Sequence, residues 1–445
     1  MYIHSLKIKN LRCFEQTELT FQYPGRQQDD PPQLPNINLL LGNNGAGKTT
    51  VLKAIALGTL APILPQSGLV PYWLVRQTTS PNGAGKRAEI NANLVLHSQD
   101  TGEKPTDSDA IWPMKIMIER IRNYESLLAL PPPVYSKEGS FWPRMFEDQS
   151  SAFLVLGYGA TRRVEYPEKL DPSARRRSRL LRYDRVAGLF ESQISLIPLG
   201  LWLPQFREKK PGRYKQVVHL VSSLLPEGAS FTGEFVDGEY LFEVEGLKTV
   251  FSALSDGYQS YIGWIGDLLY HICMGARSGK RLVDNRGIVM VDEIDLHLHP
   301  EWQRSVIARI SEALPNLQFI FTTHSPIVTG SLNRENIYVM ETTETGASVV
   351  KQYDEQVYGL SAEEVLLSSY FKLRTTRAEP FVDELKELSV RAGKGDLKAA
   401  LKYMEKLAGQ ENGSSANGGS IKKPKTKAGR KANTKNAGAK NKKAK

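Results

Sequence analysis

The chain has 445 residues, 40% of them hydrophobic, and carries a formal net charge of +10. This length and composition are sufficient for one large buried core, or for a core with an added lobe. The chain contains no run of 18 apolar residues that would predict a membrane span, and its N-terminus does not resemble a signal peptide. Its two isolated cysteines, Cys13 and Cys273, cannot form a disulfide framework. We therefore expect a reducing, cytoplasmic environment and no membrane association.

The positive charge is concentrated at the C-terminal end. Eleven of the 58 Lys and Arg residues lie in residues 413–445, which contain no Asp or Glu, so residues 1–412 hold 47 basic and 48 acidic side chains. A segment rich in Gly, Ala, Asn and Lys buries too little apolar surface to fold, and we expect a disordered Lys-rich tail at 411–445. Its composition leaves two interpretations open, contact with nucleic acid through counterion release or a solubilising or localisation role.

The N-terminal region predicts strands, a glycine loop and a helix. Residues 2–21 alternate in the manner of a two-stranded hairpin, residues 37–41 form an apolar strand, and residues 50–60 have helical spacing. The strand and helix are joined by Gly42-Asn43-Asn44-Gly45-Ala46-Gly47-Lys48-Thr49, which fits the phosphate-loop pattern GxxxxGK[ST].

This loop predicts the binding of ATP and Mg²⁺. Backbone N–H groups of such a loop surround phosphate oxygens, and the helix N-terminus adds the positive end of its dipole. Lys48 would reach the terminal phosphates, and the Thr49 hydroxyl, followed by Thr50, would bind Mg²⁺. A chance glycine turn can produce the same pattern, so the prediction depends on partner motifs elsewhere in the chain.

A second half of the site is predicted near residue 292. The apolar strand at 287–291 ends at Asp292-Glu293. A carboxylate at the end of a buried strand can hold the Mg²⁺ bound to Thr49, and Glu293 is then placed to activate the attacking water. The other elements predicted here are a buried helix after Ser255-Asp256-Gly257, one helix from Pro300 to Leu314, a strand at 318–323, a helix capped by Ser361, and amphipathic helices at 379–391 and 394–408.

The order of these motifs carries a family resemblance. Leu254-Ser-Asp-Gly-Tyr-Gln259 resembles the LSGGQ-type signature of ABC-class ATPases, in the form seen in SMC- and RecF-like proteins, and Thr322-Thr-His324 resembles the switch histidine of that family. The N-terminal hairpin is also similar to the opening hairpin of RecF- and SMC-type heads. An N-capping serine and a structural histidine are the alternatives at Ser255 and His324.

The resemblance implies an α/β fold and a homo-oligomer. It implies an ABC-type ATPase head with a mixed or parallel sheet, an inserted α-rich lobe and C-terminal helices. Ser255 and Gly257, with Asp295 of the D-loop, would act in trans on ATP held by another subunit, and His324 would contact the γ-phosphate. A metal site at His297-x-His299 is a weaker alternative because no third ligand lies nearby in sequence. The expected domains are an ATPase core at 1–60 and 250–345, the rest of the ATPase lobe with the inserted helical lobe at 61–249, a C-terminal helical region at 346–410, and the tail at 411–445.

One part of the family's site has no assignment. ABC-type ATPases carry a glutamine after a strand in the first half, where it couples the nucleotide to the inserted lobe. Gln149 and Gln193 are the candidates, whereas Gly157-Tyr-Gly-Ala-Thr-Arg162 occupies the strand end where this glutamine is expected.

Residues 292–303 and 322–326 resemble compact bacterial ATPases of anti-phage defence, namely the PtuA-type ATPases of Septu systems and retron-associated ATPases. In those systems the ATPase oligomerises and holds a separate HNH-type nuclease, which agrees with the lack of a convincing nuclease site here. The alternatives are a RecF-like DNA repair clamp, to which the tail at 413–445 would add affinity, and an assembly module that binds ATP with little turnover. An intact Glu293 argues against the assembly module.

Overall fold

The computed structural model describes residues 1–64, 69, 72–77, 86–97, 111–122, 124–130, 154–164, 184–191, 194–276 and 279–414. The chain divides into two compact units, Met1–Thr375 and Thr376–Lys445, and each is described by itself. The predicted tail at 411–445 lies outside the described residues except for 411–414, which end the last helix. No helix in the described part of the chain is long and apolar enough to cross a membrane.

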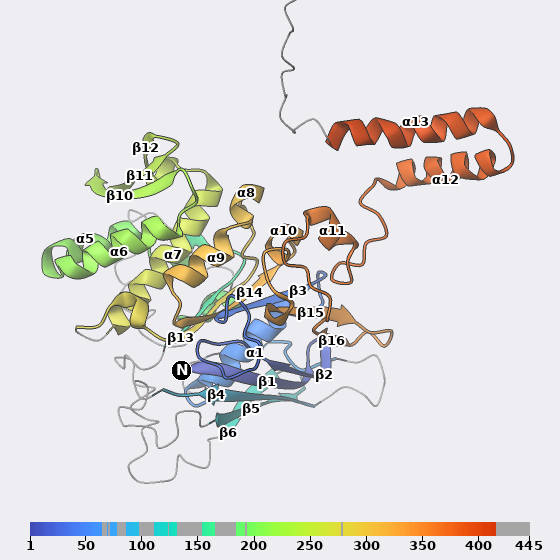
Figure 1. Cartoon of the computed structure of the whole chain (residues 1–445). Coiled ribbons are helices and arrows are strands. Elements are labelled where there is room, and N and C mark those ends of the chain that lie inside the picture. Colours follow the sequence, from blue (N-terminus) through green and yellow to red (C-terminus); the bar gives the residue numbers. More distant parts are fainter. Residues whose placement is uncertain are drawn as a thin grey trace, which may run out of the picture. The chain divides into compact units, whose positions relative to one another are not determined.

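The first unit is built on one eleven-stranded mixed sheet with the order β6-β5-β4-β1-β2-β16-β15-β3-β14-β13-β7 (Figure 1). Its strands are β1 (Tyr2–Leu11), β2 (Phe14–Thr20), β3 (Ile37–Gly42), β4 (Arg87–Val95), β5 (Ile111–Ile121), β6 (Tyr124–Leu130), β7 (Val155–Tyr158), β13 (Gly287–Val291), β14 (Leu317–Thr323), β15 (Ile337–Thr342) and β16 (Ser348–Lys351).

Strands β15, β3, β14, β13 and β7 are parallel, so the carboxyl ends of β3, β13 and β14 meet at one edge of the sheet. All residues of β13 and β14 are buried, as expected for parallel strands covered on both faces. Alternate side chains enter two hydrophobic clusters: Val289 and Phe319 lie in one, Ile288 and Ile320 in the other.

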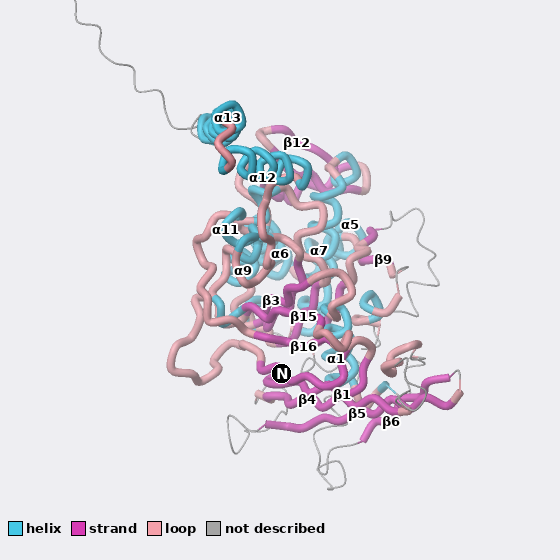
Figure 2. Tube along the Cα trace, turned by 90° about the vertical axis from the view of Figure 1, so that its right-hand side faces the viewer, coloured by secondary structure: helices cyan, strands magenta, loops and turns pink. Residues whose placement is uncertain are grey.

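Helix α1 (Lys48–Leu60) fills the space between the parallel strands and the antiparallel strands β1, β4 and β5 (Figures 1 and 2). Eleven of its residues are buried, because its apolar residues lie around the whole helix and not on one face. Gly58 is required where the helix crosses β4, because a Cβ there would lie 2.8 Å from the Cβ of Ala92. The phosphate loop is therefore anchored between two well-packed layers.

The opposite face of the parallel strands is covered by α7 (Asp256–Gly275), which follows the signature-like segment and buries twelve residues. The other elements of this layer are α5 (Leu199–Lys209), α6 (Pro211–Leu224), α8 (Pro300–Gln303), α9 (Val306–Ala313), α10 (Pro326–Thr329), α11 (Ala362–Leu367), the short strands β8 (Arg163–Val164) and β9 (Ser195–Leu196), and a small sheet of β10 (Ala229–Val236), β11 (Glu239–Val244) and β12 (Leu247–Val250).

The structure refines three sequence predictions. The segment at 61–249 contributes strands as well as helices, because β4, β5 and β6 extend the main sheet. The single helix predicted from Pro300 to Leu314 is divided into α8 and α9, since Arg304 and Ser305 form a turn in which the Ser305 N–H donates to the Trp302 carbonyl at 3.1 Å. The first unit extends past residue 345 to Thr375, because β16 pairs with β15.

The predicted capping box at Ser361 is present at the start of α11. The described part of the second unit is a helical hairpin of α12 (Glu379–Gly393) and α13 (Leu397–Ser414), close to the predicted helices. Glu384 of α12 pairs with Lys402 and Lys406 of α13.

Candidate nucleotide-binding site

The phosphate loop leaves the end of β3 and enters α1 in a conformation that its glycines permit. Gly45 and Gly47 have φ angles of +79° and +106°, which side chains other than glycine rarely adopt. A Cβ on Gly42 would lie 2.7 Å from the Met340 carbonyl oxygen, and one on Gly47 would lie 2.5 Å from Cys13 Sγ. Because α1 begins at Lys48, the backbone N–H groups of its first turn face the same pocket as the loop.

Lys48 is held by three acceptors at the mouth of the loop. Its Nζ donates to the carbonyl oxygens of Gly42 at 2.7 Å and Asn43 at 3.2 Å, and lies 2.7 Å from His324 Nε2. Burial lowers the pKa of Lys48, while the carboxylates of Asp292 and Glu293 oppose this shift. These contacts place the ammonium group above the loop, where a phosphate could replace the carbonyl oxygens as its partner.

Asp292 joins the two halves of the predicted site. Its carboxylate accepts hydrogen bonds from Thr49 Oγ1 at 2.7 Å and from Thr322 Oγ1 at 2.5 Å. Its own N–H donates to the Tyr158 carbonyl at 2.8 Å, which fixes the end of β13 against β7. A threonine hydroxyl beside a carboxylate oxygen is the hard oxygen donor set that suits Mg²⁺, so these residues fit the predicted metal.

Glu293 lies beside Asp292 in a left-handed conformation with a φ of +50°, which is uncommon for a residue other than glycine. Its N–H donates to Thr322 Oγ1 at 2.7 Å. His324 follows the next strand, and its pKa is lowered mainly by burial and further by the positive charge of Lys48. The neutral imidazole is therefore favoured, which leaves Nε2 able to accept from Lys48.

These groups line a single pocket of about 760 Å³, counting space open to solvent. The enclosed part of this space, about 350 Å³, lies within the range of ligand pockets. The lining consists of Arg12, Cys13, Asn44, Gly45, Gly47, Lys48, Thr49, Thr50, Asp292, Glu293 and His324. The structure thus brings together residues of the predicted phosphate loop, the Asp-Glu pair and the histidine, which lie about 240 to 280 positions apart in the chain.

Arg12 and Cys13 are pocket residues that the sequence analysis did not single out. They form the turn between β1 and β2, and Arg12 has a φ of +46°. The turn packs so closely on the phosphate loop that only a glycine fits at position 47. The resemblance of this hairpin to those of RecF- and SMC-type heads was the available signal, but residue type alone does not place it at the pocket.

The predicted signature residues lie elsewhere on the subunit. Ser255 is exposed at the N-terminus of α7, and a Cβ on Gly257 would lie 2.4 Å from the His297 carbonyl oxygen. Asp295 accepts a hydrogen bond from Thr323 Oγ1 at 2.5 Å. None of these three residues is among those that line the pocket described above, and their role in trans stays a prediction.

Arg162 is a further residue at the site, and it follows β7 at the strand end where the family's glutamine was expected. Its Nη1 donates to the Asp292 carbonyl at 2.6 Å and its Nη2 to the Glu293 carbonyl at 2.9 Å. The two glutamines considered for this role, Gln149 and Gln193, lie outside the described residues.

Among the described residues, the fold brings no third ligand to the alternative metal site at His297 and His299. His299 caps α8 by accepting the Glu301 N–H on its Nδ1 at 3.4 Å. Among the residues that the structure describes, no three His, Cys, Asp or Glu side chains form a group that could hold a metal. His297 and His299 are both exposed, as expected for a surface loop.

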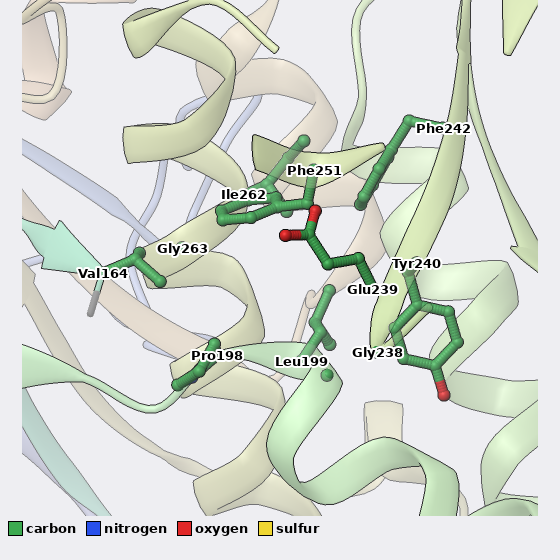
Figure 3. A pocket seen from close by; sticks show the side chains of 11 residues that line it. Val164, Pro198, Leu199, Gly238, Glu239, Tyr240, Phe242, Phe251, Ile262 and Gly263 are labelled. Carbon is green, nitrogen blue, oxygen red and sulfur yellow. The ribbon is translucent and has the colours of Figure 1, made fainter. Parts of the chain in front are cut away.

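A second pocket lies between α5, β11 and the first half of α7 (Figure 3). It is mainly apolar, with Leu199, Phe242, Phe251 and Ile262 in its lining. Its one charged side chain, Glu239, accepts the Ser252 N–H at 2.9 Å. The pocket therefore lacks the convergent polar groups of a catalytic site, and it separates the small sheet from α7.

Comparison with known proteins first defines the class. A family model described as "AAA domain" matches residues 5–68, and one described as "AAA domain, putative AbiEii toxin, Type IV TA system" matches residues 173–329. The two matches contain the phosphate loop and the Asp292-Glu293 and His324 motifs respectively. Both halves of the nucleotide site thus resemble AAA domains, in the α/β fold described above.

Similar individual proteins come from Septu and retron systems. The chain is 26% identical to Septu protein PtuA of Bacillus mycoides (strain KBAB4) over 385 residues, which cover 86% of this chain and 46% of that protein. It is 39% identical to the Retron Ec83 probable ATPase of Escherichia coli over 88 residues, 20% of this chain and 16% of that protein. A Septu protein PtuA of Bacillus thuringiensis is 31% identical over 141 residues, 31% of this chain and 36% of that protein.

The predicted resemblance to the Septu and retron ATPases is confirmed by these relatives. The chain spans less than half the length of the curated relatives it matches. Among solved structures, an SMC head bound to the C-winged helix domain of ScpA is 16% identical with a TM-score of 0.48, covering 79% of this chain and 98% of that chain.

Proposed function

We propose that the protein is a Mg²⁺-dependent ATPase that oligomerises through ATP and regulates a partner nuclease in anti-phage defence. The observation that carries the proposal is the pocket in which Lys48, Thr49, Asp292, Glu293 and His324 converge. A phosphate-binding loop, a hydroxyl–carboxylate pair for a metal and a second carboxylate free to act on water are the parts that ATP hydrolysis requires.

The residues of the pocket divide the chemistry among them. The N–H groups of residues 43–47 and of the first turn of α1 bind the phosphates, and Lys48 exchanges its contacts with the Gly42 and Asn43 carbonyls for phosphate oxygens. Thr49 and Asp292 hold Mg²⁺, which neutralises charge on the phosphates. Glu293 accepts a proton from the attacking water, and His324 contacts the terminal phosphate.

The position of the signature residues supports the proposed oligomer. Ser255 is exposed at the start of a twenty-residue helix, where its hydroxyl and the free N–H groups of the first turn suit a phosphate. Because these groups do not line the pocket of their own subunit, a second copy must supply them to complete the site. We infer an ATP-bound dimer in which Ser255, Gly257 and Asp295 of one subunit close over ATP on the other.

The role in defence rests on the relatives. The similarity to Septu protein PtuA covers 86% of this chain. Two short segments resemble parts of nuclease sites, Glu245-Gly-Leu-Lys248 and the strand-end Glu341, but Lys248 forms an ion pair with Glu234, and Glu341 forms ion pairs with Lys351 and Lys372. A separate HNH-type nuclease would supply the cleavage, in the cytoplasm where both proteins act.

A RecF-like clamp on DNA is the second candidate function. The observation that favours it is the concentration of eleven Lys and Arg residues in 413–445, against a balanced charge in the rest of the chain. In this alternative the same ATP-dependent closure would hold duplex DNA instead of controlling a nuclease.

The Glu293→Gln variant tests the activity and the partner together. It should bind ATP and accumulate as the closed dimer, with turnover lowered about 100- to 10,000-fold, because the general base is lost while the phosphate contacts remain. Glu301→Gln, on the exposed start of α8, is the matched control and should hydrolyse ATP at the wild-type rate. Normal turnover by Glu293→Gln would overturn the assigned role.

The same variant, tagged and purified with ATP from the organism that encodes it, identifies the partner. An HNH-type nuclease recovered with Glu293→Gln but not with a Lys48→Ala control would support the defence function. Recovery of DNA and repair proteins instead would favour the clamp.

A further inference from the structure

We propose that Arg162 positions the Asp292-Glu293 pair for hydrolysis by holding its two main-chain carbonyls. The inference rests on the proposed ATPase function. It adds Arg162 as a residue that acts on the main chain behind the two carboxylates. The guanidinium reaches two consecutive carbonyl oxygens, at 2.6 Å for Asp292 and 2.9 Å for Glu293. One planar side chain therefore fixes the peptide that joins the metal-binding residue to the general base.

This peptide needs an external restraint. Glu293 has a φ of +50°, a conformation that costs free energy for a residue with a Cβ and persists only where surrounding contacts impose it. Thr322 restrains the pair from one side, since its hydroxyl accepts the Glu293 N–H and donates to the Asp292 carboxylate. Arg162 restrains it from the other side, at the carbonyl oxygens.

The positive charge of Arg162 does not occupy the carboxylates of Asp292 and Glu293. Burial lowers the pKa of Arg162 to about 10, and the charges of Asp292, Glu293 and Asp295 oppose this shift, so Arg162 remains a cation at neutral pH. Its hydrogen bonds nevertheless go to main-chain oxygens, and the described residues show no ion pair between Arg162 and these carboxylates. The carboxylate of Asp292 stays available for the metal and that of Glu293 for water.

The segment that carries Arg162 is itself rigidly seated. A Cβ on Gly159 would lie 2.2 Å from the Gly188 carbonyl oxygen, so the turn at 184–190 packs directly on this backbone. Tyr158 donates its hydroxyl to Asp267 of α7 at 3.0 Å, and Asp267 is buried beside His271. The segment 158–162 thus contacts α7, whose N-cap is Ser255, through Tyr158, and the Asp292-Glu293 backbone through Arg162.

A lysine cannot reproduce this arrangement, because one ammonium group lacks the planar fork that reaches both carbonyls. The Arg162→Lys variant of the full chain should therefore lose at least tenfold in kcat, while its KM and its affinity for a fluorescent ATP analogue change less than threefold. Arg162→Met should likewise lose kcat with little change in KM or nucleotide affinity. The control Arg281→Lys, at an exposed arginine that pairs with Asp284, should match the wild type. In the Glu293→Gln background, Arg162→Lys should cause no further loss, because Arg162 acts through Glu293.

The outcomes separate this inference from the proposed function. A wild-type protein without ATP turnover would overturn the function and this inference with it. Wild-type turnover with an unchanged kcat in Arg162→Lys would overturn the positioning role alone, as would parallel losses of kcat and nucleotide affinity. If both Arg162 variants lose ATP binding and the cooperative thermal transition, Arg162 maintains the fold rather than the catalytic pair, and the inference fails.

Discussion

Lys48 and His324, 276 residues apart, lie with Nζ and Nε2 separated by 2.7 Å at the ends of two parallel strands. The contact joins the phosphate loop to the loop after β14, and a phosphate bound by Lys48 must compete with the histidine for the same ammonium protons. The sensing of the terminal phosphate would then be a change of hydrogen-bond partner, which requires no large movement of either strand.

A mixing experiment tests whether the site is completed in trans. Lys48→Ala should abolish ATP binding in its own subunit, and Ser255→Arg should block the signature end of α7; each variant alone should be inactive. An equal mixture should recover about a quarter of the wild-type activity, because half of the dimers would be mixed and each would hold one intact site. A mixture as inactive as its components would contradict assembly in trans.

The pH dependence of stability tests the environment of His324. Its pKa lies below the ordinary histidine value of 6.5 because burial, and then the charge of Lys48, disfavour the imidazolium. The unfolded chain therefore binds a proton near pH 6.5 that the folded chain does not, and stability falls as the pH decreases below 6.5 until the folded pKa is reached. His324→Gln should reduce this loss, as measured by thermal unfolding between pH 5 and 8 (about the range in which histidine titrates). An identical pH profile in the variant would rule out this contribution.

A pair of glycine variants tests the close packing of the phosphate loop. Gly47→Ala combines an unfavourable φ of +106° with overlap of Cys13 and Phe14, and should destabilise the fold by about 1–3 kcal/mol and abolish ATP binding. Gly346 has a φ of +74° with no atom within 4 Å of an added Cβ, so Gly346→Ala carries only the backbone cost. Equal effects of the two substitutions would show that the contact with the β1–β2 turn is unimportant.

Removal of residues 415–445 tests the alternative DNA function. If the tail provides affinity for nucleic acid, the truncated protein should lose most of its salt-sensitive binding to duplex DNA, because all eleven Lys and Arg residues of the tail are removed. ATP turnover should be unchanged, since every residue of the pocket lies before residue 325. Duplex binding that survives truncation with the same salt dependence would place the DNA contact in the folded units.

The chemistry-bearing strands and helix were predictable because their signals are local. The glycine loop between β3 and α1, the acidic residues that end β13 and the histidine after β14 are each visible within about ten positions of sequence. Parallel strands then bring their carboxyl ends together, which explains why the structure gathers these residues in one pocket.

The residues that escaped prediction act through shape or backbone. Arg162 binds carbonyl oxygens, which every residue possesses, so no residue type at positions 292 and 293 reveals the contact. Cys13 reaches the pocket only because Gly47 lacks a side chain. Strand β4 was missed because only Ile90 and Leu94 of its alternating buried residues are strongly hydrophobic, the other two being Ala88 and Ala92.

The interleaving of early and late strands has a consequence for synthesis of the chain. The N-terminal strand is completed by late residues: the Ile3 N–H donates to Gln318 Oε1 at 2.8 Å, and Tyr2 donates its hydroxyl to the Asn316 carbonyl at 2.7 Å. The pocket takes residues from positions 12 to 324. A chain still emerging from the ribosome therefore cannot form the whole pocket until residue 324 has been made, and binding of nucleotide would report that the strands of the sheet have come together.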